Sequence, residues 1–259
     1  MCGIVGYVGQ SDATAPLIDG LARLEYRGYD SAGISIHTGN DITTLKRAGK
    51  LSVLNNALSA QPMPNGNLGI GHTRWATHGS PIDRNAHPHT DPERKIALIH
   101  NGIIENYLLL KSHLESIGHH FESDTDSEVV AHLLGNEYAE SKSLTKAMQN
   151  VCQKLKGNFS LVAIAVDAPG MLVGARRNSP LVVGLGEREN FLASDVAAFI
   201  SFTRRALEIG QDSVVTLTPD SCSITDFHGN PISAKKFEVT WDAGAAQKNG
   251  FTHFMAKEI

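Results

Sequence analysis

Several features that mark particular classes of protein are scarce in this sequence. Across 259 residues with a formal net charge of −4, Lys and Arg cluster only in short pairs, so no basic face for a nucleic acid is expected. No apolar run approaches the roughly 18 residues of a membrane-spanning helix. The first residues also lack the basic and apolar regions of a signal peptide. We therefore expect a cytoplasmic protein without nucleic-acid or membrane partners.

Cysteine is also scarce, because the chain has only Cys2, Cys152 and Cys222. An odd number at wide spacing argues against a disulfide framework and for a reducing compartment. Five histidines between residues 72 and 100 have no cysteine among them and match no standard zinc spacing. We interpret these histidines as structural residues or as supports for other site residues, and we expect neither a metal nor another cofactor.

The apolar pattern predicts an α+β fold with helices on the outer faces of sheets. The polar stretch at 75–94 is long for a loop in a compact domain, and such loops are often functional. Helices are predicted between Asp12 and Gly28 and at 51–59, 106–117, 127–138 and 144–155. Strands are predicted at 2–8, 32–37, 42–46, 68–73, 96–100, 159–166, 171–175, 181–186, 191–193, 213–217 and 237–239.

Cys2 would become the N-terminal residue if Met1 were removed, which a small second residue favours. An α-amine has a pKa of about 7.7–8.0 and a thiol of about 8.5. The neutral amine could therefore take the thiol proton, so that one residue supplies both nucleophile and base. A cysteine at position 2 can equally be incidental, so its position alone does not show that Cys2 is a nucleophile.

Other residues could complete a site around such a nucleophile. Asn101 and Gly102 are suitable donors to an oxyanion, although Asn-Gly is also a common turn. Arg74 could grip a carboxylate and Trp75 could cover a ligand, or both could be ordinary surface and packing residues. The acidic run at 122–128 suits a helix N-terminus and leaves one carboxylate free to bind an ammonium. Together these groups outline a site for a small zwitterion with a reactive carbonyl.

Several motifs occur in the order found in the class II, or N-terminal nucleophile, glutamine amidotransferases, and the sequence resembles this family from end to end. Motifs at 25–30 and 74–78 favour the glutaminase domains of the glucosamine-6-phosphate synthases within it. The resemblance implies a four-layer α/β/β/α sandwich of the N-terminal-nucleophile hydrolase type. The matching segments are 2–6, 24–33, 72–79, 85–89, 100–106, 123–128 and 179–181.

The resemblance also implies roles for single residues. Cys2 would be the nucleophile with its own amine as general base, and the Asn101 side chain and Gly102 N–H would form the oxyanion hole. Arg74 would bind the carboxylate of L-glutamine and Asp126 its α-ammonium group.

Four further residues receive supporting roles from the same resemblance. Thr77 and His78 would line the glutamine pocket, and Trp75 would gate the passage of ammonia. Arg27 would support the site around the nucleophile.

At the level of the whole protein, the resemblance implies a glutaminase domain at 1–240 and, at 241–259, a linker toward a sugar-phosphate isomerase domain absent from this sequence. Fructose 6-phosphate would bind to that domain, and the full-length enzyme would be a homodimer that makes glucosamine 6-phosphate.

Two alternatives stay open. The chain could be the glutaminase domain of another class II amidotransferase. It could also be a non-catalytic glutamine-binding module if Met1 is retained, because the nitrogen of Cys2 is then an amide that cannot act as a base.

Overall fold

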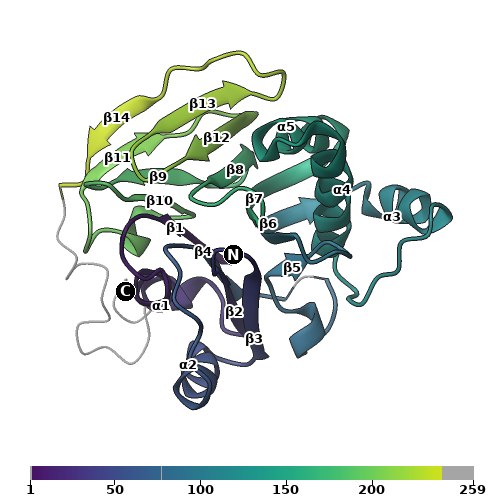
Figure 1. Ribbon diagram of the computed structural model, residues 1–259, viewed down its shortest axis with the longest axis horizontal. Coiled ribbons are helices and arrows are strands. Elements are labelled where there is room, and N and C mark those ends of the chain that lie inside the picture. The colour runs from purple at the N-terminus through teal and green to yellow at the C-terminus, as the bar shows by residue number, and fades with distance from the viewer. Residues whose placement is uncertain (1, 77, 241–259) are drawn as a thin grey trace, which may run out of the picture.

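The computed structural model describes residues 2–76 and 78–240. Within these residues the larger of two antiparallel sheets has eight strands in the order β14-β11-β9-β10-β1-β4-β2-β3 (Figure 1). Its strands are β1 (Gly3–Val8), β2 (Ser31–His37), β3 (Ile42–Ala48), β4 (Leu68–Arg74), β9 (Val182–Leu185), β10 (Asn190–Ala193), β11 (Arg205–Glu208) and β14 (Lys235–Glu238).

The smaller sheet has six strands in the described part of the chain, in the order β13-β12-β8-β7-β6-β5. Its strands are β5 (His89–Thr90), β6 (Ile96–Ile104), β7 (Gly157–Ala165), β8 (Leu172–Arg177), β12 (Ser213–Leu217) and β13 (Cys222–Asp226).

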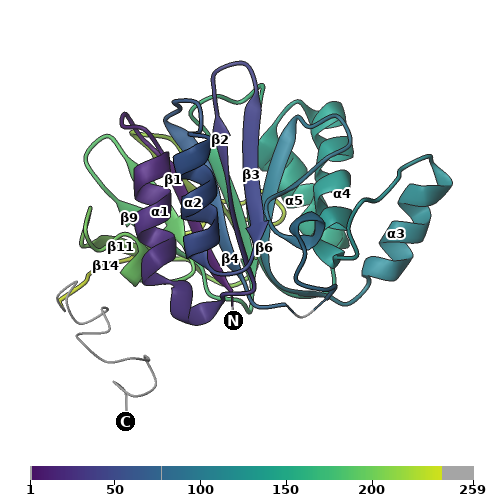
Figure 2. The same cartoon turned by 90° about the horizontal axis from the view of Figure 1, so that it is seen from below.

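Helices cover the outer faces of both sheets. The α-helices are α1 (Thr14–Arg23), α2 (Leu51–Ala60), α3 (Tyr107–Ser116), α4 (Asp126–Ser141) and α5 (Leu144–Lys154), and short 3-10 helices lie at Glu25–Arg27, Asp83–Asn85 and Val196–Ala198. Figure 2 shows α1 and α2 on one side of the sheets and α4 and α5 on the other, with α3 projecting from the body.

Three hydrophobic cores hold these layers together. Leu17 and Leu54 pack the first helical layer onto the large sheet, and Val130 and Met148 pack the second onto the small sheet. A third core, which includes Ile70, lies between the two sheets. The predicted α+β class and its four-layer α/β/β/α order are therefore confirmed.

The register of the large sheet fixes where the chain begins. Gly3 pairs with Thr73, so Cys2 lies at the end of β4 where Arg74 leads into the long loop. A Cβ atom on Gly3 would lie 2.6 Å from the Thr73 hydroxyl oxygen and 2.8 Å from Cβ of Leu24. Glycine therefore allows the close approach that brings the two strand ends together.

Several predicted boundaries differ from the structure. The helix expected to run to Gly28 ends at Arg23, because the chain turns into a 3-10 helix at Glu25–Arg27. Strands β5, β11 and β13 were not predicted from the sequence, and β5 lies within the stretch predicted as a loop. The predicted linker at 241–259 lies outside the described residues.

Candidate functional site

The Cys2 thiol lies against the backbone that follows β4. Its Sγ accepts a hydrogen bond from the N–H of Trp75 at 3.1 Å and lies 3.5 Å from the carbonyl oxygen of the same residue. Burial raises the pKa of the Cys2 thiol, and the Trp75 N–H opposes that effect in part. The thiol is therefore protonated near neutral pH and needs a base to become a nucleophile.

Asn101 and Gly102 stand opposite Cys2 on the small sheet. The amide Nδ2 of Asn101 donates to the carbonyl oxygen of Cys2 at 2.9 Å. Both residues lie inside β6 and not in a turn, because the strand continues to Ile104, beyond its predicted end. Gly102 has a φ of 127°, and a Cβ atom there would lie 1.9 Å from the carbonyl oxygen of Asn158. This backbone conformation requires glycine.

Arg74 is buried and organises the start of the long loop. Its guanidinium donates to three successive carbonyl oxygens, those of His78, Gly79 and Ser80. The side chain of Asp30 accepts the N–H of Ala76 at 2.8 Å and holds the same segment. Arg74 thus places a permanent positive charge in the same cavity as Cys2, and backbone carbonyl oxygens of the loop surround that charge.

Asp126 begins α4 and is buried, with 4% of its surface exposed. Its Oδ2 accepts the N–H of Ile104 at 2.9 Å, and its Oδ1 accepts the Ser127 hydroxyl at 3.3 Å. The Nδ1 atom of His100 lies 3.9 Å from the same carboxylate. The helix N-terminus also favours a negative charge at this position.

The other predicted residues divide between the cavity and its surroundings. Trp75 is 46% exposed, and its ring meets that of Tyr29 edge to face at 5.5 Å between centroids. His78 contacts the ring of Tyr107. Arg27 lies outside the cavity and pairs with Asp195 at 2.6 Å.

Thr77 lies outside the described residues. Most of the other predicted groups line one small cavity of about 20 Å³. The cavity is lined by Cys2, Arg74, Trp75, His78, His87, His100, Gly102, Thr125, Asp126 and Ser127. Six of the nine residues predicted for the site therefore line one space, and Asn101 adjoins it through its bond to Cys2.

Four buried histidines line or adjoin the cavity, and from the sequence they were assigned no more than structural or supporting roles. Burial lowers the pKa of His72 to about 3, and it also lowers the pKa of His87, His89 and His100. All four are therefore neutral at pH 7. Alternation along β4 places His72 on the same face as Arg74, which is a signal that sequence reasoning could have used. Within the described residues, no group of His, Cys, Asp and Glu side chains is placed to hold a metal ion.

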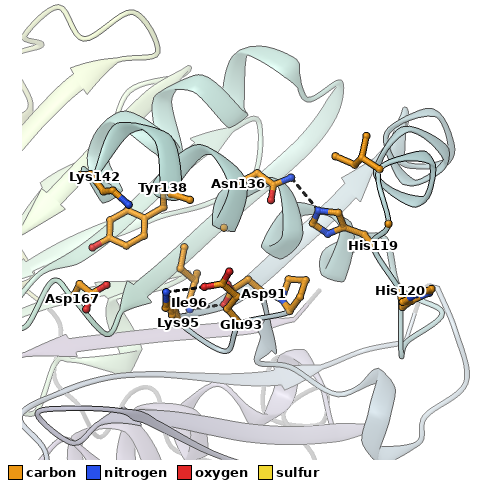
Figure 3. Close-up of a pocket in the computed structure, with 15 residues that line it drawn as sticks. Asp91, Glu93, Lys95, Ile96, His119, His120, Asn136, Tyr138, Lys142 and Asp167 are labelled. Atoms are coloured by element: carbon orange, nitrogen blue, oxygen red, sulfur yellow. Dashed lines mark hydrogen bonds and ion pairs between the residues drawn. The ribbon is translucent and has the colours of Figure 1, made fainter.

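A second, larger cavity of about 630 Å³ lies away from Cys2, beside α4 (Figure 3). Charges of both signs line it, including Asp91 and the ion pair between Lys95 and Glu93. In the wall of this cavity, Nδ2 of Asn136 and Nε2 of His119 form a hydrogen bond of 3.1 Å. None of the residues predicted for the site lines this cavity.

A family model described as "Glutamine amidotransferase domain" matches residues 72–201, which is half of the chain. The chain belongs to this family. Glutamine–fructose-6-phosphate aminotransferases (isomerizing) are similar along the whole chain, with 57% identity in Leifsonia xyli and 56% in Streptomyces coelicolor. The chain spans 42% of the length of each of these relatives.

Solved structures place the fold in the same group. A glutamine phosphoribosylpyrophosphate amidotransferase from B. subtilis superposes with a TM-score of 0.76 at 25% identity, covering 89% of this chain and 50% of that one. A second structure, described as the allosteric regulatory enzyme of purine biosynthesis, gives 0.75 at 27% identity, covering 87% and 49%. The predicted N-terminal-nucleophile hydrolase fold is confirmed. In the described part of the chain no helix is long and apolar enough to cross a membrane.

Proposed function

We propose that this chain hydrolyses L-glutamine to glutamate and ammonia, with Cys2 as the nucleophile. One observation carries the proposal: Cys2, Arg74 and Asp126 line the same cavity, and the Asn101 amide donates to the carbonyl oxygen of Cys2. A nucleophile, a cation, an anion and an amide donor are the groups that a zwitterionic amide substrate requires.

In the first half of the reaction, the free amine of Cys2 takes the thiol proton, and the thiolate attacks the side-chain amide carbon of glutamine. The negative charge that develops on the amide oxygen is stabilised by Nδ2 of Asn101 and the N–H of Gly102. The protonated amine then gives its proton to the leaving nitrogen. Ammonia departs and a γ-glutamyl thioester remains on Cys2.

In the second half, water attacks the thioester carbon while the Cys2 amine takes a proton from the water. The C–S bond breaks, the thiol is restored and glutamate leaves. The same two donors stabilise the second tetrahedral intermediate.

Selectivity for glutamine comes from two charges in the wall of the cavity. Arg74 binds the α-carboxylate and Asp126 binds the α-ammonium group, and a ligand that lacks either would leave a buried charge unpaired. The carbonyl oxygens of His78, Gly79 and Ser80 already accept from Arg74, so this loop must adjust when the carboxylate binds. Thr77 and His78 complete the pocket, Trp75 gates the exit of ammonia and Arg27 supports the surrounding backbone.

In the whole protein, this ammonia would serve the synthesis of glucosamine 6-phosphate from fructose 6-phosphate. The names and greater length of the similar aminotransferases support this extension. Residues 1–240 would form the glutaminase domain, and 241–259 would lead to an isomerase domain that binds the sugar phosphate in a homodimer. The cytoplasm is the proposed location, which the three free cysteines support.

Mass spectrometry and a glutamate assay test the proposal together. The chain with Met1 removed should release glutamate, and a thiol-directed glutamine analogue should label Cys2. Cys2→Ala should lower the rate at least about 100-fold, whereas Cys222→Ala, at the only other partly exposed cysteine of the described residues, should leave it unchanged.

Appreciable glutamine hydrolysis by Cys2→Ala would refute the mechanism. A processed chain that binds glutamine but neither hydrolyses it nor becomes labelled would be a glutamine-binding module.

A further inference from the structure

The Asn101 amide is held in one orientation by contacts at both of its ends. Nδ2 donates to the Cys2 carbonyl oxygen at 2.9 Å, and Oδ1 lies 2.9 Å from Nε2 of His72. Rotation of the amide by 180° would place Oδ1 against the Cys2 carbonyl, where two acceptors would repel each other. The group that faces Oδ1 therefore helps to decide whether N–H groups point toward the nucleophile.

A backbone carbonyl fixes the protonation of His72. The Nε2 atom lies 3.1 Å from the carbonyl oxygen of His100 as well as 2.9 Å from Oδ1 of Asn101. A carbonyl oxygen can only accept, so Nε2 must carry the hydrogen and share it between the two oxygens. Nδ1 of His72 has no hydrogen-bond partner among the described residues, and His72 is 1% exposed. A second proton on this ring would therefore have no partner.

We infer that His72 is a positioning residue whose Nε2–H, anchored by the His100 carbonyl, holds the Asn101 amide with Nδ2 toward Cys2. This inference rests on the proposed role of Asn101 in glutamine hydrolysis. An amide nitrogen carries two hydrogens, so one can bond to the Cys2 carbonyl while the other meets the substrate oxygen. His72 thus acts on the reaction through Asn101.

The inference predicts which steps depend on His72. The steps that form an oxyanion require the oriented Asn101 amide, so kcat should fall when the Nε2–H donor of His72 is removed. Glutamine binding depends on Arg74 and Asp126, so KM should change little. Alkylation of the Cys2 thiol by iodoacetamide forms no oxyanion, and its rate should also change little.

Two variants of similar shape separate the donor from the bulk of the ring. His72→Gln can place an N–H near the position of Nε2, whereas His72→Met cannot. In the chain from which Met1 has been removed, His72→Met should lower kcat by about 10- to 100-fold, which is less than the about 100- to 1000-fold cost of losing a whole oxyanion donor. His72→Gln should recover most of that loss.

His37 provides a control, because it is also buried and its Nε2 lies 2.8 Å from a backbone carbonyl oxygen, that of Val166. His37 is the last residue of β2, whereas the first residue of that strand pairs with Arg74 at the site. His37→Met should leave kcat per folded molecule unchanged. In an Asn101→Ala background, His72→Met should lower kcat little further, because the amide that it positions is gone. An equal loss in both backgrounds, or a parallel fall in the alkylation rate, would overturn the inference.

Nitrogen-15 NMR of the His72 ring tests the inference without relying on activity. The expected signals are those of a neutral ring protonated at Nε2, and the Asn101 side-chain amide signals should shift in His72→Met but not in His37→Met. A ring protonated at Nδ1, or unshifted amide signals, would overturn the inference and leave the proposed function standing. An Asn101→Ala variant with unchanged kcat would instead remove Asn101 from the oxyanion hole, and the inference with it.

Discussion

At the scale of single residues, the site depends on backbone that only certain side chains permit. Gly102 has a φ of 127°, and the Asn158 carbonyl oxygen lies so close to it that there is no room for a Cβ atom. An Asn-Gly pair in a sequence is typical of a turn, and nothing in the pair itself indicates a strand. The structure places both residues in β6, where the glycine lets the strand present Asn101 to Cys2.

The first prediction concerns Gly102→Ala. The added Cβ would lie 1.9 Å from the Asn158 carbonyl oxygen, so the strand must shift, and we expect a loss of about 2–4 kcal/mol in the free energy of unfolding. Urea denaturation measures this loss. Gly39→Ala is the matched control, because Gly39 has a φ of 95° but no atom within 4 Å of its added Cβ. It should lose only about 1 kcal/mol. Equal losses in the two variants would contradict the account.

At the scale of elements, the loop after β4 is tied to the residues that precede α4. Asn85 is fully buried and donates to the Ser80 carbonyl at 3.0 Å and to the Asp124 carboxylate at 3.1 Å. Its Oδ1 accepts the N–H of Asp124 at 2.9 Å. The Asn85 amide therefore links the loop that Arg74 organises to the segment that leads into Asp126.

The second prediction follows from this link. Asn85→Ala should raise the KM for glutamine about 10-fold, which corresponds to about 1.4 kcal/mol of binding free energy. This is a modest cost for the loss of three buried hydrogen bonds. Steady-state kinetics measures the change. Arg84→Ala removes an exposed partner of the same Asp124 carboxylate and should change KM less than twofold. A larger effect for Arg84 than for Asn85 would contradict the link.

The elements also show how far the sequence could be read. Helices α1, α2, α4 and α5 pack apolar side chains onto the sheets, and their positions could be predicted from the spacing of those residues. Strand β11 (Arg205–Glu208) buries only its two central residues, and β13 (Cys222–Asp226) fully buries only Ile224. Strands this short, with so few buried residues, carry little apolar signal. The site residues were found through motifs, whereas His72 could be assigned a partner only from the structure.

At the scale of the whole molecule, buried neutral histidines link stability to pH. Burial lowers the pKa of His72 to about 3 and that of His132 to about 4, while an unfolded histidine has a pKa of about 6.5. Between these values the unfolded chain binds more protons than the folded chain. Stability is therefore complete above about pH 6.5 and is lost as the pH falls toward the folded pKa values.

The third prediction is a fall in the free energy of unfolding of at least about 2 kcal/mol between pH 7 and pH 5, which is the contribution of one such histidine. Urea denaturation at both pH values measures it. His132→Phe should reduce the fall, because Phe cannot take up a proton when unfolded. Substitution of the exposed His228 by Phe should leave the fall unchanged. Equal or greater stability at pH 5 would contradict the prediction.

The fourth prediction addresses the central claim, that the thiol and the free amine of Cys2 act together. Burial raises the pKa of this thiol, so a base must take its proton near neutral pH. The measurement compares glutamine hydrolysis by two forms of the chain whose intact masses show Met1 removed or retained. The account predicts a rate at least about 100-fold lower with Met1 retained, the lower range for loss of a general base. Equal rates in the two forms would contradict it.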